Sequence, residues 1–271
     1  MKNNYAALVT KVREKSPLVQ QITNFVTVND CANITLAIGA SPIMADAIGE
    51  SADIAAISGA LVLNMGTLDE ADVRSMVAAG KSANANGVPV VYDPVGAGAS
   101  KLRNDTVALL TRELKLSVIR GNISEIKYIA GVASQTKGVD AAQSDIDDPE
   151  SVGKMAKALA AKLGCVIVVS GAVDVLSDGE RLVFIENGHP MLTRLTGTGC
   201  MCTALIGCFC GAHSDSLEGA VAGMLCMGIA GEIAYEKAGQ FGNGSFHAAL
   251  LDAVSLMDAK TFERVAKYRE G

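Results

Sequence analysis

A glycine-flanked turn, Thr196-Gly-Thr-Gly-Cys200, is the segment of this sequence best suited to chemistry. It precedes a small, apolar helix predicted over residues 201–209. Glycines at 197 and 199 would let the main chain approach a ligand closely, and a helix N-terminus attracts anions through its N–H groups and dipole. The turn therefore predicts a site for a phosphoryl group that gains negative charge. A glycine-rich helix entry that binds no ligand is the alternative interpretation.

Cys200 begins the predicted helix, where the dipole lowers the pKa of a thiol and favours the thiolate. It is a candidate nucleophile, base or positioning group, and a buried structural cysteine is the alternative. Three further cysteines follow closely, but residues two apart on a helix point to different faces, so we interpret them as core residues: Cys202, Cys208 and Cys210. The three histidines are scattered without the spacing of metal ligands: His189, His213 and His247.

A second polar cluster, Arg120-Gly-Asn122-Ile-Ser-Glu125, stands just past a predicted strand. Arginine offers a planar fork for phosphate oxygens, and Mg²⁺ prefers water and carboxylate ligands, often only one or two of them from the protein. Asp93 lies at a neighbouring predicted strand end and could share that ion. The cluster predicts a site for phosphates and Mg²⁺, with a helix cap and a surface ion pair as the alternative.

Short apolar runs alternate with helical patterns through most of the chain. The strands are predicted at 88–93, 117–120 and 165–170, and the helices at 69–86, 105–115 and 149–163. This alternation is typical of βαβ units with a buried parallel sheet. Ligands of such sheets bind beyond the carboxyl ends of the strands, where Asp93, Arg120 and Ser170 stand.

The pattern changes after residue 174. Two strand-like runs around an Asp178-Gly179 turn predict an antiparallel hairpin over 175–185, and therefore a mixed sheet. From Cys200 onward the pattern is almost wholly helical, with long helices predicted at 216–235 and 245–265. No linker or repeat divides the chain, so residues 1–271 are predicted to form a single domain.

Composition excludes several classes of partner. The net charge of -6 and the lack of a long Lys/Arg run argue against nucleic-acid binding. Apolar runs such as 61–65 and 220–230 fall short of the roughly 20 residues that span a bilayer, and no signal sequence is found, so we expect no membrane contact and a cytoplasmic location. The seven cysteines are then expected to be free thiols.

Three segments together carry a family resemblance. Asp93-Pro-Val-Gly-Ala-Gly98, Asn122-x-x-Glu125 and the Gly197-Thr-Gly-Cys200 turn, in this order, resemble the ribokinase-like superfamily. Most of its kinases have aspartate where Cys200 stands, and the version with cysteine is similar to the hydroxyethylthiazole kinase family. Two N-terminal segments match that family as well: Gln20-Gln-Ile-Thr-Asn24-Phe-Val and Ser41-Pro-Ile-Met44-Ala-Asp46. The resemblance implies a ribokinase-like α/β fold, a mostly parallel central sheet flanked by helices on both faces.

The resemblance also implies an activity: ATP-dependent phosphorylation of the hydroxyl of 4-methyl-5-(2-hydroxyethyl)thiazole, in thiamine biosynthesis and salvage. It implies ATP and Mg²⁺ as cofactors, and a homotrimer with the active site at the subunit interface. Carried onto this chain, the family's residues are Cys200 as the catalytic group, Asn24, Met44, Gly66 and Gly197 at the thiazole, Arg120, Asn122, Ser170 and Gly199 at ATP, and Asp93 and Glu125 at Mg²⁺. Ser170 stands where the family commonly has threonine, and the hydroxyl is kept.

Other functions remain open from the sequence. A kinase for a hydroxymethylpyrimidine or an ATP-dependent repair dehydratase would share the fold, although both usually carry aspartate where Cys200 stands. A thiol hydrolase or acyltransferase would use Cys200 as nucleophile and need a nearby base, such as His189 or His213. A non-catalytic ligand-binding relative is disfavoured by the retained motifs. Walker, protein-kinase and Gly-x-Ser-x-Gly signatures are absent.

Overall fold

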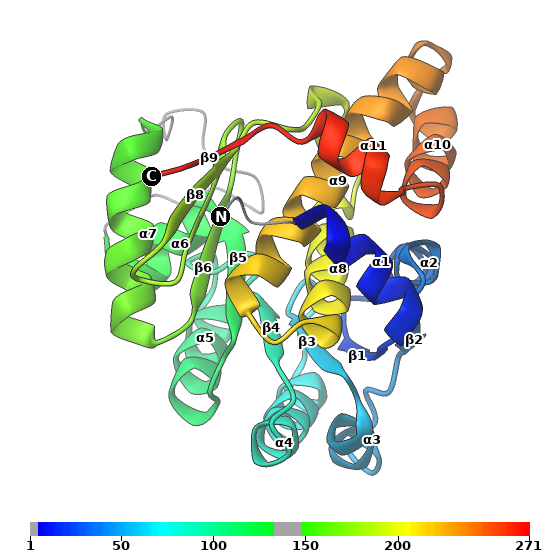
Figure 1. Cartoon of the computed structure of the whole chain (residues 1–271). Coiled ribbons are helices and arrows are strands. Elements are labelled where there is room, and N and C mark those ends of the chain that lie inside the picture. The colour runs from blue at the N-terminus through cyan, green and yellow to red at the C-terminus, as the bar shows by residue number, and fades with distance from the viewer. Residues whose placement is uncertain (1–4, 133–147) are drawn as a thin grey trace.

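The computed structural model describes residues 5–132 and 148–271, and the strands in these ranges form one sheet (Figure 1). The strands are β1 (Leu18–Ile22), β2 (Ser41–Ile43), β3 (Ala60–Asn64), β4 (Val90–Asp93), β5 (Val118–Asn122), β6 (Val166–Ser170), β7 (Asp174–Ser177), β8 (Leu182–Ile185) and β9 (Tyr268–Glu270). Their order in the sheet is β2-β1-β3-β4-β5-β6-β7-β8-β9. Neighbours up to β6 pair in parallel, and later pairs are antiparallel, which confirms the predicted mixed sheet and the β7–β8 hairpin.

Helices alternate with the parallel strands as the sequence predicted. They are α1 (Tyr5–Lys15), α2 (Val28–Ile38), α3 (Ser51–Ile57), α4 (Glu70–Ala85), α5 (Lys101–Glu113), α6 (Ile123–Ala130), α7 (Pro149–Leu163), α8 (Thr198–Ala212), α9 (Ser216–Ala238), α10 (Asn243–Ser255) and α11 (Ala259–Val265), with short 3-10 helices η1 (Pro190–Arg194) and η2 (Gly239–Phe241). Side-chain caps set several starts, as at α5, where the Ser100 hydroxyl accepts the N–H of Arg103.

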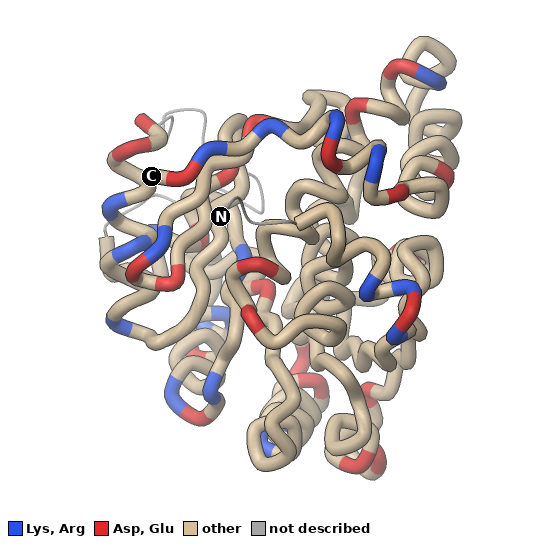
Figure 2. The backbone as a smooth tube through the Cα atoms, viewed as in Figure 1, with Lys and Arg blue, Asp and Glu red and all other residues tan. Residues whose placement is uncertain are grey.

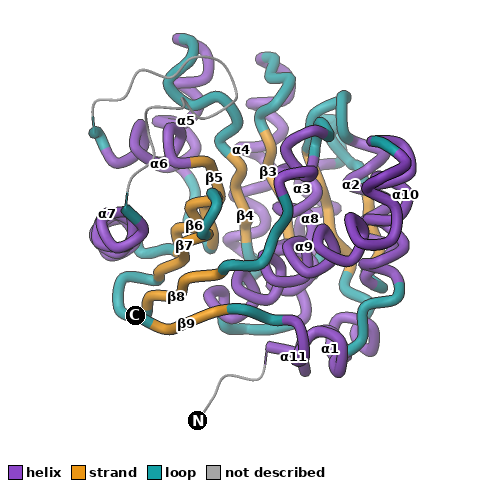
Figure 3. The backbone as a smooth tube through the Cα atoms, turned by 90° about the horizontal axis from the view of Figure 1, so that it is seen from above, coloured by secondary structure: helices purple, strands orange, loops and turns teal. Residues whose placement is uncertain are grey.

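The sheet lies between two helical layers. Along β3, Leu61 and Leu63 pack with α3 to α7, whereas Val62 between them packs with α1, α2 and α8 to α11, because successive strand residues point to opposite faces. Figure 3 shows α6 and α7 on one side of the strands and α9 on the other. The predicted α/β architecture is therefore confirmed.

Helix α8 occupies the centre of its layer and carries no charged residue, as its unbroken tan tube shows in Figure 2. Glycines bring it close to its neighbours. A Cβ on Gly207 would lie 2.5 Å from a methyl group of Val62 in β3, and one on Gly223 in α9 would lie 2.8 Å from the Cα of Ile206. These close approaches fix how deep α8 lies between the sheet and α9.

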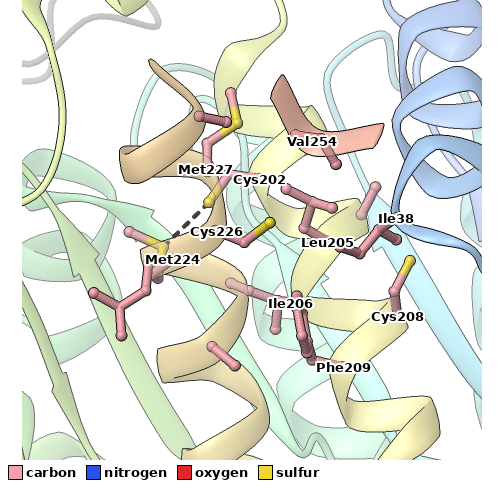
Figure 4. Packing of buried hydrophobic residues seen from close by; sticks show 14 of the residues in the cluster. Ile38, Cys202, Leu205, Ile206, Cys208, Phe209, Met224, Cys226, Met227 and Val254 are labelled. Carbon is pink, nitrogen blue, oxygen red and sulfur yellow. Dashed lines mark hydrogen bonds between the residues drawn. The ribbon is translucent and has the colours of Figure 1, made fainter. Parts of the chain in front are cut away.

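The cysteines after Cys200 are core residues, which confirms our interpretation. Cys202, Cys208 and Cys226 are surrounded by apolar side chains, and the Sγ of Cys202 lies 3.2 Å from the Sδ of Met224 (Figure 4). Burial raises the pKa of both Cys202 and Cys208 to about 12. In the described part of the chain, no three His, Cys, Asp or Glu side chains form a group suited to a metal ion.

Several boundaries differ from the prediction. The helix expected at 245–265 is two helices, α10 and α11, because the Asp258 carboxylate accepts the N–H of Thr261 and starts a new helix. Strand β5 extends to Asn122, two residues beyond the predicted end at Arg120, so Asn122 lies within the strand rather than past it. The apolar stretch Ser216–Phe241 is long enough to cross a membrane by length and composition, but 83% of its most apolar window is buried in the fold. Core packing accounts for that composition.

Candidate active site

The predicted site residues gather at the carboxyl end of the parallel strands, around the point where the strand order reverses. β1 pairs with β2 on one side and β3 on the other, and open α/β sheets bind their ligands at such a point. Asn24 follows β1 and Asn64 ends β3, and the Nδ2 of Asn24 donates to the Oδ1 of Asn64 at 2.9 Å. The backbone N–H of Gly66 donates to the same oxygen at 2.9 Å.

Helix α8 points its N-terminus at these residues. Gly197 is its N-cap, with a left-handed φ of 86°, and a Cβ there would lie 2.4 Å from the Cγ2 of Thr27, so only glycine fits. Glycine offers no capping side chain, which leaves the first N–H groups of α8 available to an anion. Cys200, in this first turn, accepts a hydrogen bond from the Nδ2 of Asn24 at 3.3 Å.

The state of the Cys200 thiol differs from our expectation. Burial of the side chain and the nearby negative charge of Asp93 raise its pKa above the ordinary 9.0, and these effects exceed the hydrogen bonds that lower it. The prediction that the helix dipole favours a thiolate is therefore wrong. At neutral pH the sulfur is a half-buried neutral thiol, suited to position a ligand rather than to accept a proton.

Asp93, at the end of β4, is 1% exposed, and only one of its two carboxylate oxygens has hydrogen-bond partners. Its Oδ2 accepts hydrogen bonds from the Oγ1 of Thr203 at 2.7 Å and the Nδ2 of Asn64 at 3.0 Å, and the guanidinium of Arg120 lies 3.9 Å away. Its Oδ1 is buried and has no hydrogen-bond partner. Burial raises the pKa of this carboxyl, and Arg120, Thr203 and Asn64 oppose that rise.

Glu125 is a second buried carboxylate beside Asp93. Its Oε1 accepts the N–H of Gly96 and its Oε2 the N–H of Asn122, both at 2.8 Å, while Asn122 caps α6 by accepting the N–H of Glu125. The helix cap proposed from sequence as an alternative is thus present. It also ties the loop after β4 to the end of β5. Burial, followed by the charge of Asp93, raises the pKa of Glu125 to about 7.

Arg120 joins this acidic pair to the neighbouring strand and to α8. Its Nη2 donates to the Oγ of Ser170 on β6 at 2.9 Å. A Cβ on Gly199 would lie 2.7 Å from its Nη1, so the guanidinium sits directly beneath the first turn of α8. Its Nε is buried without a hydrogen-bond partner. The fold therefore places Arg120, Ser170 and Gly199 together, as the sequence predicted for one site.

Met44 and two of the histidines are the remaining residues that the sequence singled out. Met44 follows β2, one strand further out than Asn24, and is half-buried. His189 stacks on Tyr235. The Nε2 of His213 lies 2.7 Å from Glu218, and His213 stands beyond the opposite end of α8 from Cys200, about 20 Å along the helix at 1.5 Å per residue. Among the described residues, Cys200 accepts its hydrogen bond from Asn24 rather than from either histidine, and this disfavours the thiol hydrolase.

Sequence reasoning missed four residues of this site. Asn64 and Thr203 bond Asp93. Arg103 in α5 donates to main-chain carbonyls of both the β3 and β4 loops. Asp174 accepts the N–H of Gly171 at 2.9 Å just after Ser170, and burial raises its pKa to about 7. The strand-end rule that selected Asp93 also applies to Asn64; nothing in the sequence marks Thr203, which lies in mid-helix.

Comparisons with known proteins agree over nearly the whole chain. A family model described as the hydroxyethylthiazole kinase family matches residues 9–260. The chain is 58% identical to "Hydroxyethylthiazole kinase" of Ruminiclostridium cellulolyticum, covering 97% of this chain and 96% of that protein. It superposes on the hydroxyethylthiazole kinase structure from Pyrococcus horikoshii OT3 with a TM-score of 0.89 at 38% identity, covering 98% of each chain. A Staphylococcus aureus pyridoxal kinase structure, at 14% identity and a TM-score of 0.59, covering 80% of this chain and 88% of its own, shares the fold.

Proposed function

The chain belongs to the hydroxyethylthiazole kinase family, and we infer that it is the phosphotransferase that converts 4-methyl-5-(2-hydroxyethyl)thiazole to its phosphate in thiamine biosynthesis and salvage. The observation that carries this inference is the convergence of the α8 N-terminus, Cys200 and Asp93 on one point. Phosphoryl transfer needs mainly positioning and charge stabilisation, which such a point supplies.

We propose that the nucleotide phosphates bind between Arg120, Ser170, Asn122 and Gly199. Arg120 supports this role because its buried Nε lacks a partner, and its guanidinium lies between two strand ends beneath the α8 N-terminus. An arginine fork matches phosphate oxygens, and the free N–H groups of α8 would stabilise the charge of the transferred group. ATP is the donor that this arrangement and the family imply.

Asp93 and Glu125 are the proposed ligands of Mg²⁺. The fit rests on the buried Oδ1 of Asp93, an acceptor without a hydrogen-bond partner. Two carboxylates suit Mg²⁺, which usually keeps several waters and completes its shell with phosphate oxygens. When bound there, the ion would neutralise charge on the phosphates. Asp93 and Glu125 would hold it next to Arg120.

The thiazole alcohol is proposed to bind beside Asn24, Gly66, Gly197 and Cys200. The neutral thiol of Cys200 would place the hydroxyl near the α8 N-terminus. Its raised pKa speaks against a thiolate base, and a loose phosphoryl-transfer transition state requires little base catalysis. Cys200 is then a positioning group in the catalytic site.

Replacing Cys200 by alanine is expected to lower kcat about 10-fold without abolishing turnover, since only a positioning contact is lost. Steady-state ADP release measures this change. Cys165→Ala, at a buried cysteine remote from the turn, is the matched control and should keep wild-type kcat. Complete loss of turnover in a folded Cys200→Ala protein would contradict the positioning role.

The test of the function itself is ADP release by the purified protein with ATP and Mg²⁺. The acceptors compared are hydroxyethylthiazole, hydroxymethylpyrimidine and none. Thiazole-dependent ADP, together with thiazole phosphate identified by mass, is the expected result. Stimulation by the pyrimidine alone would change the substrate and keep the fold.

We also propose a cytoplasmic homotrimer with the thiazole pocket at the subunit interface. Large apolar side chains are exposed beside Asn24 and Met44, including Phe25 at 78%, Val26 at 55% and Ile48 at 57%. Such a cluster is typical of a surface that another chain covers. The half-buried position of Met44 at the sheet edge is explained if a second copy completes the pocket there. The free thiols fit a reducing compartment.

Sedimentation of the wild-type protein is expected to give the mass of three chains. Phe25→Asp, which puts a charge into the exposed apolar cluster, should shift the protein towards monomers and raise the KM for the thiazole alcohol. Phe241→Asp, at a residue 70% exposed after α9, is the matched control. A monomeric wild-type protein with full activity would overturn the trimer.

A further inference from the structure

We propose that Asn64 is a positioning residue that links the acceptor pocket to Asp93 through a hydrogen-bond chain of fixed direction. The proposal rests on the proposed function for the roles of Asn24, Gly66 and Asp93. It assigns to Asn64 itself no contact with substrate. Asn64 would act by holding Asn24 and Gly66 on one side, and Asp93 on the other, in fixed relative positions.

The direction of the Asn64 amide is fixed by the backbone. Asn64 is 2% exposed, and its Oδ1 accepts the N–H of Gly66 at 2.9 Å. A backbone N–H can only donate, so the amide oxygen must face Gly66. The Nδ2 group must then face Asp93, to whose Oδ2 it donates at 3.0 Å. An amide turned the other way would point its NH₂ at two donors, the Gly66 N–H and the Asn24 Nδ2, and its oxygen at an acceptor, the Oδ2 of Asp93.

Asn24 is oriented by the same logic. The backbone N–H of Thr27 donates to its Oδ1 at 3.1 Å, and the Thr27 hydroxyl does so at 3.0 Å. Its Nδ2 therefore donates both to Asn64 and to the Sγ of Cys200. The chain of donors runs one way, from Thr27 through Asn24 and Asn64 to Asp93. The orientation of both side-chain amides in this chain is fixed by a main-chain N–H group that donates to the amide oxygen.

The end of the chain determines which oxygen of Asp93 is available. Asn64 and Thr203 both donate to Oδ2, which fixes the plane of the carboxylate. Oδ1 is left buried and without a partner. Asn64 thus presents one chosen oxygen of Asp93 to the phosphoryl side, and on its other side holds Asn24 and Gly66 in the acceptor pocket.

This arrangement predicts that one isosteric change separates acceptor binding from phosphoryl transfer. In Asn64→Asp, one carboxylate oxygen still accepts from Gly66 and Asn24, but the other opposes Oδ2 of Asp93 in place of a donor. We expect the Kd for the thiazole alcohol, measured by calorimetry without ATP or Mg²⁺, to stay within about 3-fold of wild type. We expect kcat to fall about 10²-fold, because the lost interaction belongs to the transfer step.

Thr203 provides an independent variant on the same oxygen. Thr203→Val keeps the shape and removes the donor, so kcat should fall about 10-fold with Kd for the alcohol unchanged, and Thr203→Ser should restore it. Asn86→Asp, on an exposed end of α4, is the matched control for the added charge. Should Asn64→Asp fail to fold, the Thr203 pair decides the question.

Two results would overturn the proposal. In one, Asn64→Asp loses affinity for the alcohol as strongly as it loses kcat, which would make Asn64 a wall of the pocket. In the other, Asn64→Asp or Thr203→Val keeps wild-type kcat. A wild-type protein that binds the alcohol but forms no phosphate would instead refute the proposed function, so the two failures are distinguishable.

Discussion

Asp93→Asn is expected to reduce phosphoryl transfer about 10³-fold and to leave the protein folded. Thr203 and Asn64 both donate to the Oδ2 position, so they hold the amide oxygen of the new asparagine there. The amide NH₂ must then occupy the Oδ1 position, where it would face any bound cation as a donor. The substitution therefore replaces the unbonded acceptor Oδ1 of Asp93 by a hydrogen-bond donor.

The measurement for Asp93→Asn is kcat by ADP release over a series of Mg²⁺ concentrations, together with the melting temperature. Asp105→Asn is the matched control, because its side chain is 60% exposed on α5. The melting temperature should not fall, since burial already disfavours the charged form of Asp93. An Asp93→Asn protein with more than about a tenth of wild-type kcat would remove Asp93 from the proposed role.

Arg120→Gln is the second change with a large expected effect. The guanidinium of Arg120 lowers the pKa of Asp93, Glu125 and Asp174. Without it we expect the KM for ATP to rise and kcat to fall, by about 10² in kcat/KM, because the phosphates lose a charged donor. Arg112→Gln, at a side chain 67% exposed on α5, is the matched control.

Arg120→Gln should also change how stability depends on pH. Loss of the cation raises the pKa of three buried acids further. An acid whose pKa is raised by folding contributes stability below its unfolded pKa, and this contribution is lost as pH rises through the folded pKa. The free energy of unfolding of the variant should therefore drop more between pH 6 and pH 8 than that of wild type. The free energy of unfolding is measured by urea titration at each pH. An equal drop between pH 6 and pH 8 in the variant and in wild type would show that Arg120 does not lower the pKa of these acids.

Much of the fold was predictable because its signals are local. The apolar runs that became β4, β5 and β6 end near polar residues, and caps and glycines bound the helices between them. The break after Ser255 was missed because apolar spacing continues through it and only the Asp258 cap interrupts the helix. The C-terminal strand β9 was missed because three residues carry too little pattern.

The residues of the candidate site could be selected from the sequence, but their hydrogen bonds could not. Asp93, Glu125 and Cys200 stood out by type and position, and the family resemblance supplied Asn24 and Gly66. The direction of the pKa shift of Cys200 could not be inferred, because burial and the charge of Asp93 raise it through contacts that a single sequence does not show. Thr203 lies 110 residues from Asp93, and such a contact leaves no trace in a single sequence.

The glycine contacts of α8 have a further consequence for the reaction. Its axis is held against backbone and short branched side chains, at Gly207 over Val62 and at Ile206 under Gly223, where no flexible side chain can yield. The helix cannot slide towards a ligand, so its N–H dipoles must already be aimed before the substrate arrives. Dipoles that are aligned in advance need no reorganisation as charge develops in the transition state. In water, by contrast, solvent dipoles would first have to reorient around that charge. The close packing of α8 at Gly207 and Ile206 thus helps to lower the activation free energy of phosphoryl transfer, although these residues do not contact the reacting atoms.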